Sequence, residues 1–159
     1  MLMNTSVLKK WSALRGIAVV VPRQGRKVGV VEDFFFKAGT GVVYALLVDT
    51  GVEGMRSLPT SGISAVTDDS VAIFNAEMLI RALPPLPTGS SLLSYKVVGE
   101  SGIEVGTVGE VVLDIEPPVI RIAALELAEK RGKRVLGDEV LHYHQGLIVI
   151  DDQDARRLR

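Results

Sequence analysis

The chain of 159 residues is 47% hydrophobic, which is typical of a globular protein and not of a disordered one. Its 18 Lys and Arg residues nearly balance its 19 Asp and Glu residues, so no overall field attracts nucleic acid or an anionic membrane. The absence of cysteine excludes disulfides and thiolate chemistry and favours a cytoplasmic location.

Neither a signal peptide nor a membrane span is expected. A charge appears at Lys9 before any long apolar run, which is not the pattern of a signal peptide. The longest uncharged apolar run in a strand-like segment covers the eleven residues 38–48, whereas a transmembrane helix needs about 20. We therefore expect no membrane insertion.

Short strands are predicted along the first part of the chain. The segments are rich in β-branched and aromatic side chains, and glycine, proline or aspartate separates most of them. They lie at 16–22, 27–36 and 41–48, near Leu58, and at 63–66 and 71–74. Asn75 then precedes a run of helix formers and is a suitable helix N-cap. Five or six such strands predict a small β-barrel that ends in a short helix.

The strand predicted at 27–36 departs from the alternation of a strand that buries one face. Its apolar residues Val31 and Phe34 are three apart instead of two, with Glu32 and Asp33 between them. We predict a β-bulge there, with the Asp33 carboxylate accepting hydrogen bonds from backbone N–H groups that the bulge frees. A general acid or base is the alternative role, but no histidine, lysine or second acid has a matching repeated position.

The same pattern returns about 77 residues later. Gly25 and Gly29 recur as Gly102 and Gly106, and this shift places residues 42–48 on 119–125. With the register slipped by one residue, 69–74 falls on 145–150. The break in alternation also recurs, with Gly109 and Glu110 between two valines, so a second bulge is predicted, in which the Glu110 carboxylate takes the role of Asp33. Asp151 or Asp152 is the predicted N-cap of a second short helix.

The repeat and an uncharged proline-rich segment define the predicted domains. Residues 1–81 form a first barrel, residues 82–91 a linker, and residues 92–159 a second barrel. The predicted fold class is therefore all-β: two tandem small barrels of five to six strands, each ending in a short helix.

The first copy resembles a PRC-barrel domain, the β-barrel module of the photosynthetic reaction centre H subunit and of RimM-type ribosome maturation factors. The resemblance rests on residues 12–48, on Ser-Leu-Pro at 57–59, on Ile63 and on residues 68–74. The second copy is similar at 102–113 and in its last strand, with Leu136-Gly137 in place of Leu58-Pro59. The resemblance implies a protein-docking or scaffold barrel without shared catalytic residues.

Candidate interaction residues come from apolar strands and basic loops. Phe34 and Phe36 share the face predicted to form the core, so Phe35 points the other way, and the strand containing Tyr44 is apolar on both faces. Packing of the two copies, a homodimer or another protein could cover this outer face, and intramolecular packing is favoured. A basic cluster consists of Lys130, Arg131, Lys133 and Arg134, and further basic residues lie between Lys9 and Lys27, before the first acid. Together they suggest an RNA- or ribosome-associated assembly factor as the alternative function.

A second alternative is a small-ligand or metal-binding barrel. His142 and His144 are two residues apart on a predicted strand, so they share a face and could bind a metal with Glu139 or a nearby acid. The first copy has no matching histidine. The glycines at 25–29 and 39–41 form no phosphate-binding motif, and no nucleophile elbow occurs. We expect no cofactor and no enzymatic activity, and the favoured function is docking through apolar strand surfaces near Phe35 and Tyr44.

Overall fold

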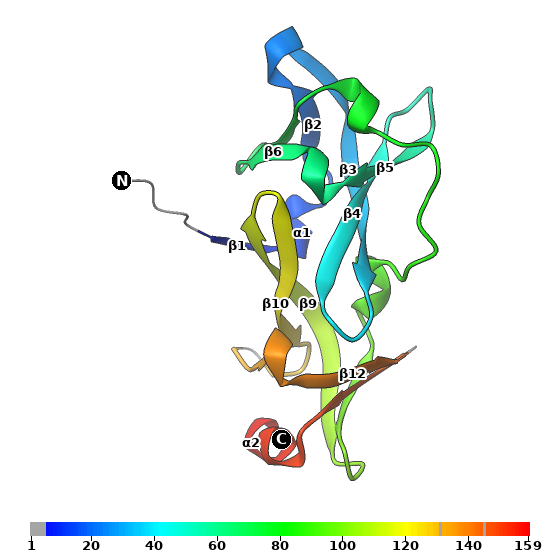
Figure 1. Ribbon diagram of the computed structural model, residues 1–159. Helices are drawn as coiled ribbons and strands as arrows, with labels where there is room; N and C mark the ends of the chain where they lie inside the picture. The colour runs from blue at the N-terminus through cyan, green and yellow to red at the C-terminus, as the bar shows by residue number, and fades with distance from the viewer. Residues whose placement is uncertain (1–5, 131, 145) are drawn as a thin grey trace.

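The computed structural model describes residues 6–130, 132–144 and 146–159, and most of its regular structure is strand, as predicted (Figure 1). The strands of the first half are β1 (Val7–Lys10), β2 (Ala18–Val21), β3 (Arg26–Lys37), β4 (Val42–Asp49), β5 (Met55–Pro59), β6 (Ile63–Val66) and β7 (Ser70–Ile73). Those of the second half are β8 (Lys96–Gly99), β9 (Glu104–Glu116), β10 (Val119–Leu127), β11 (Arg134–Leu136), β12 (Val140–His144) and β13 (Leu147–Ile150).

Helices are short in the described chain. The α-helices are α1 (Trp11–Leu14) and α2 (Asp152–Leu158). Single 3-10 turns are η1 (Pro22–Gln24), η2 (Thr60–Gly62), η3 (Ala76–Met78), η4 (Gly89–Leu92) and η5 (Gly137–Glu139).

The strands form one continuous hydrogen-bonded path. Its order is β12, β13, β8, β9, β10, β4, β3, β2, β7 and β6, while β1 pairs with β9, β5 with β4, and β11 with β10. The first half therefore lies at one end of an elongated molecule and the second half at the other, and they join where β4 meets β10 (Figure 1). The sheet is not closed, and the expected pair of separate barrels is not confirmed.

Both halves use the same set of strand pairings. β2 is antiparallel to β3 and parallel to β7, and β8 is antiparallel to β9 and parallel to β13. The long hairpin β3–β4 carries β5 at its side, and β9–β10 carries β11 in the same way. The internal similarity of the sequence therefore has a counterpart in the order of the strands.

The equivalence of β4 and β10 differs from the predicted one. Phe34 pairs with Leu46 and Val111 pairs with Leu125, which places β10 79 residues after β4, not 77. The β9–β10 hairpin continues for two further pairs, Ile115 with Ile120 and Glu116 with Val119, before it turns. This longer hairpin explains the two extra residues. With the offset of 79, the residue of the second half that corresponds to Val42 is Arg121, which is also the residue that pairs with Val42.

Both predicted bulges are confirmed. The pairing of β3 with β4 skips Glu32, and the pairing of β9 with β10 skips Gly109. A Cβ at Gly109 would lie 2.8 Å from the Ala128 Cα, so this position needs glycine for close backbone approach. Each bulge increases the local twist of a long strand and so helps it to curve around the core.

The N-terminal segment of each half packs on the other half. β1 pairs along β9, with Lys10 opposite Val112, and α1 also contacts β9. In the same way Thr88 pairs with Phe35 of β3, the Phe36 N–H donates to the Pro87 carbonyl at 3.1 Å, and η4 contacts β3. The two halves are therefore joined by exchanged segments as well as by the β4–β10 pairing.

One hydrophobic core runs through the molecule. Phe34 and Phe36 are almost completely buried, as predicted, and Trp11 packs edge-on against Phe34 with ring centroids 5.1 Å apart. Phe36 in turn packs against Tyr143 of β12 at 5.6 Å. Because this chain of rings links residues from both halves, the two cannot be separated without exposing large aromatic surfaces.

Both predicted N-caps are confirmed, with helices of different length. The Asn75 side chain accepts a hydrogen bond from the Glu77 N–H at 2.9 Å, but only the single turn η3 follows. The Asp151 side chain accepts from the Gln153 N–H at 2.7 Å at the start of the two-turn helix α2. α2 packs on β8 at Gly99, where a Cβ would lie 2.9 Å from the Ala155 Cβ.

Candidate docking surface

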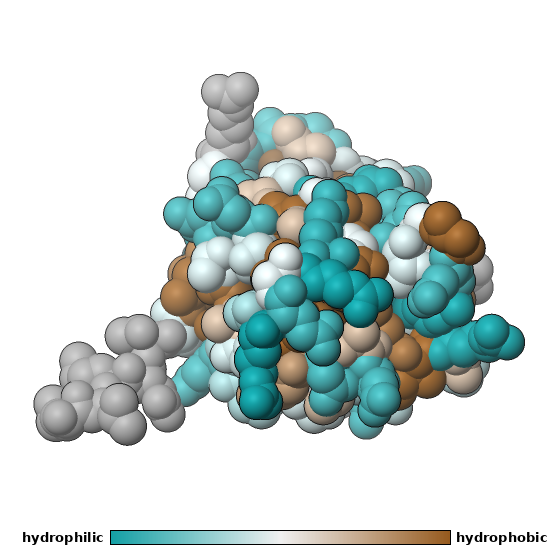
Figure 2. Space-filling view, turned by 90° about the horizontal axis from the view of Figure 1, so that it is seen from above, coloured by the Kyte–Doolittle hydropathy of each residue, from teal (hydrophilic) through white to brown (hydrophobic). Residues whose placement is uncertain are grey.

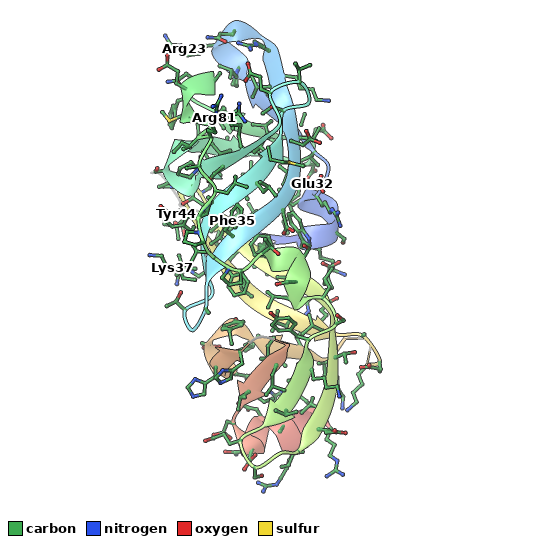
Figure 3. The ribbon with its side chains drawn as sticks, turned by 90° about the vertical axis from the view of Figure 1, so that its right-hand side faces the viewer. Arg23, Glu32, Phe35, Lys37, Tyr44 and Arg81 are labelled. Atoms are coloured by element: carbon green, nitrogen blue, oxygen red, sulfur yellow. The ribbon has the colours of Figure 1, made fainter. Side chains whose placement is uncertain are left out.

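Phe35 lies beneath the chain's own linker. Ile80 pairs with Ser57 on β5, and Thr88 pairs with Phe35 on β3, so the segment between them crosses from one side of β4 to the other. The opposite face of these strands is filled by the core, so the segment passes over the outer face, where it runs past Phe35 (Figure 3). Phe35 is consequently only 5% exposed.

Tyr44 lies at the surface. The register of β4 shifts between Val43 and Ala45, so Tyr44 is the extra residue of a further bulge, and its side chain is 44% exposed. The Lys37 ammonium lies 5.6 Å from the centre of its ring, within the range of a cation–π interaction. Both side chains stand at the outer margin of the hairpin (Figure 3).

The exposed apolar residues nearest to Tyr44 in the sheet register come from both halves. Val42 pairs with Arg121, and the strands run antiparallel, so Tyr44 and Val119 each lie two residues from this pair on the same side of the sheet. Val119 is 44% exposed and Val42 is 36% exposed. We call Val42, Tyr44 and Val119 the junction face.

Charges surround the junction face. Lys37 and Arg121 supply cations, while Asp114 and Glu116 of β9 pair with Arg121 and Val119 across the hairpin. These acids, Arg121 and the turn Pro117-Pro118 line a hollow of about 510 Å³ beside Val119. By contrast, the end view of the molecule shows polar side chains interspersed with small apolar areas (Figure 2). An apolar centre with a rim of both signs is suited to recognising another protein.

The acids at the bulges bind backbone N–H groups, as predicted. The Asp33 carboxylate accepts from the Phe34 N–H at 2.8 Å and from the Ser90 N–H at 2.9 Å, and it also accepts from the Ser90 hydroxyl. Glu110 accepts from the Val111 N–H at 3.0 Å and from the Ser12 N–H at 3.2 Å. In both cases the second donor belongs to an exchanged segment, so each acid holds the two halves together.

The described residues of the basic cluster make contacts within the chain. The Lys130 and Lys133 ammonium groups donate to the Leu158 carbonyl at 2.9 and 3.5 Å, which places positive charge at the C-terminal end of α2. Arg134 forms an ion pair with Glu126 at 2.6 Å. Arg131 lies outside the described residues.

Glu126 is held in its charged form by these cations. Burial acts to raise the pKa of Glu126, but the hydrogen bond from Arg134 and the charges of Arg134 and Lys10 outweigh it and lower the pKa. The Lys10 ammonium lies 3.5 Å from this carboxylate. Lys10 and Arg134 come from opposite ends of the sequence, so this cluster also joins β1 to the second half.

His142 and His144 share a face of β12, as predicted, with ring centroids 5.3 Å apart and both side chains exposed. Glu139, the suggested third ligand, accepts from Arg157 at 3.1 Å. Across the described parts of the chain, no group of three His, Cys, Asp or Glu side chains is arranged to hold a metal ion.

Three residues at the junction were not singled out from the sequence: Val42, Val119 and Arg121. No local signal marks them, because their proximity depends on the pairing of β4 with β10. The sequence marked Tyr44 only weakly, because polar and apolar residues do not alternate regularly along the strand that contains it.

Comparison with known proteins supports the resemblance of the second half to a PRC-barrel domain. Residues 88–156 match the family model of the PRC-barrel domain. The match begins within the segment predicted as linker, includes η4 and ends within α2. The resemblance of the first half, from which the family was inferred, stays a prediction. No curated protein matches the chain.

None of the helices described is long and apolar enough to cross a membrane.

Proposed function

We propose that this protein is a docking module built from two PRC-type units, and that it acts by binding another protein through the junction face. The observation that carries the proposal is the group of exposed apolar side chains on both sides of the β4–β10 pairing. The β-rich fold and the PRC-barrel match of the second half support the scaffold class. The proposed mechanism is binding alone, without catalysis.

The charges around the junction face suit a partner protein of complementary charge. Tyr44 and Val119 have charged neighbours of both signs, Lys37 and Arg121 on one side and Glu116 on the other. A partner with an apolar anchor and complementary charges would bury the centre of the face and leave the ion pairs at the rim.

The test is capture of partners from native lysate by the immobilised protein. We expect that the wild type specifically captures at least one protein that the variant with Tyr44→Glu and Val119→Glu no longer captures, because two buried carboxylates would be left without partners. Val52→Glu is the matched control, since Val52 is fully exposed in the β4–β5 loop and its change should preserve capture.

Two results would contradict the proposal. In the first, the double variant captures the same proteins as the wild type. In the second, light scattering shows a dimer that Tyr44→Glu converts to a monomer, which would make the junction face a self-association surface.

The basic cluster gives less support to an RNA- or ribosome-associated function. Lys130, Lys133 and Arg134 each have a partner within the chain. If the protein binds RNA, affinity should fall steeply with salt and with neutralisation of these residues; salt-independent binding would exclude this alternative.

A further inference from the structure

A groove of about 530 Å³ lies between β1 and β6. Within the described chain, β1 pairs only with β9, and β6 pairs only with β7. Starting from β1, the strands are paired one after another through β9, β10, β4, β3, β2 and β7 to β6. In this part of the sheet the groove thus lies between the unpaired edges of β1 and β6.

The β6 edge offers backbone groups to the groove. The Thr67 N–H donates to the Ser70 carbonyl on the β7 side at 2.9 Å. Neighbouring residues of a strand direct their N–H groups to opposite edges, so the Val66 N–H faces the groove. Val7, Val66 and Ile115 line the same groove with apolar side chains. An added strand would therefore find hydrogen-bonding groups on its edge and apolar contacts along its side.

The groove also contains a buried cation. The Lys9 side chain is only 10% exposed, and its ammonium donates to the Thr67 carbonyl at 3.0 Å. The nearest carboxylate, that of Asp68, is 3.8 Å away and fully exposed, so water screens it strongly. An ammonium has three donors, and a carboxylate brought in by an occupant would be a stronger partner than the neutral carbonyl.

The equivalent groove of the second half has a similar volume, about 500 Å³, but a different lining. Pro87 lies beside Phe36 there, as Lys9 lies opposite Leu113 in the first groove. Proline removes the N–H group of this edge, and Phe36 and Tyr143 meet across the groove with ring centroids 5.6 Å apart. The repeat of 77 residues makes Leu113 and Val66 the counterparts of Phe36 and Tyr143, and neither has an aromatic ring. The first groove is therefore the one suited to an added strand.

We propose that the β1–β6 groove binds an extended peptide segment of a partner protein that carries an acidic side chain. The peptide adds to the edge of β6, its apolar residues contact Val7 and Ile115, and its carboxylate binds Lys9. This is strand addition to a sheet edge, in which the backbone supplies affinity and the side chains supply specificity. The groove adjoins the hollow beside Val119, since Pro117 lines both. It contains none of the residues of the junction face, so the proposal does not depend on the function proposed above.

The experiment is a titration of the isotope-labelled protein with the peptide acetyl-Thr-Val-Asp-Val-Thr-Val-Thr-amide, followed by amide chemical shifts. We expect the largest shifts at Val66, Thr67 and Lys9. A peptide with N-methyl groups on alternate residues keeps its side chains but cannot pair along one edge, and its affinity should be at least about tenfold lower.

Two protein variants test the charge. Lys9→Gln should weaken binding by about tenfold, because a charge-assisted hydrogen bond is lost. Asp68→Asn should strengthen it by about threefold, because a competing carboxylate near the ammonium is removed. Tyr44→Glu, on the junction face, should leave peptide affinity unchanged.

Several outcomes would overturn the proposal. One is the absence of shifts at millimolar peptide, which would mean that Lys9 only protects a sheet edge from pairing. Equal binding of the N-methylated peptide would exclude strand addition. If the Lys9→Gln and Asp68→Asn variants bound the peptide with equal affinity, recognition of an acidic side chain would be excluded. If the chemical shift changes were confined to the junction face, the peptide site would lie there instead.

Discussion

The hydroxyl of Tyr143 is a buried polar group for which no hydrogen-bond partner is found among the described residues. Its ring packs on Phe36, and its oxygen lies 3.5 Å from where a Cβ at Gly41 would stand. Burial raises the pKa of Tyr143 to about 12. Since the neutral phenol is the form favoured by the fold, its contribution to stability is complete below pH 10 and is lost as the pH rises from 10 to about 12.

Tyr143→Phe should therefore stabilise the protein. We expect the free energy of unfolding at pH 7 to rise by about 1 kcal/mol, because an unpaired buried hydroxyl is removed. The loss of stability between pH 10 and 12 should also become smaller than in the wild type. Denaturant unfolding at pH 7, 10 and 11.5 measures both effects.

Tyr44→Phe is the matched control, because it removes an exposed phenol. It should leave the dependence of the unfolding free energy on pH as in the wild type. Destabilisation by Tyr143→Phe at pH 7 would mean that the hydroxyl has a partner.

The element that depends most on a single small residue is η4. A Cβ at Gly89 would stand 1.9 Å from the ring of Phe34, which is completely buried between the two halves. No positive φ is involved, so the requirement for glycine is one of space. Nothing in the local sequence marks this glycine, because the ring that excludes a side chain lies 55 residues earlier.

Gly89→Ala should lower the free energy of unfolding by about 3 kcal/mol, since Phe34 must leave its position or η4 must leave β3. Phe34→Leu, which shortens the side chain, should restore part of this loss in the double variant. Thermal unfolding of the two single variants and the double variant gives the coupling. Additive effects would show that Gly89 and Phe34 are not in contact.

At the scale of elements, the local signals in the sequence were sufficient for strands β2 to β7, for the two bulges and for the caps, but not for β1. The broken alternation at Glu32 and Gly109, and the caps Asn75 and Asp151, appear as expected because each depends on neighbouring residues. The equivalence of β4 with β10 was wrong by two residues, because hairpin length follows from pairing across the turn.

The docking residues were harder to predict for a related reason. Phe35 is buried by a linker that pairs at both of its ends, and Val119 joins the face of Tyr44 through a contact between the halves. Both depend on residues distant in sequence. The position of Lys9 between β1 and β6 had no signal either, because the groove exists only after β1 has paired with β9.

At the scale of the molecule, the exchanged segments and the shared core should make unfolding a single event. Trp11, from the first half, lies in the core beside β9, so its fluorescence reports on both halves. We expect fluorescence and far-ultraviolet circular dichroism to give coincident transitions in denaturant, and the calorimetric enthalpy to equal the van't Hoff enthalpy. Two separated transitions would show that the halves unfold independently.

The exchange also sets the order in which the chain can reach its native state during synthesis. Ser12 precedes its acceptor Glu110 by 98 residues. At roughly 5–20 residues per second, the ribosome makes that acceptor about 5–20 s after it has made α1. Once β7 has been made, the first half has all its strands, but α1 and Trp11 have no β9 to pack on, and β3 has no η4. A pause in translation after β7 would therefore prolong a stage with an exposed tryptophan and an uncovered phenylalanine, at which chaperone binding or misassembly competes with folding.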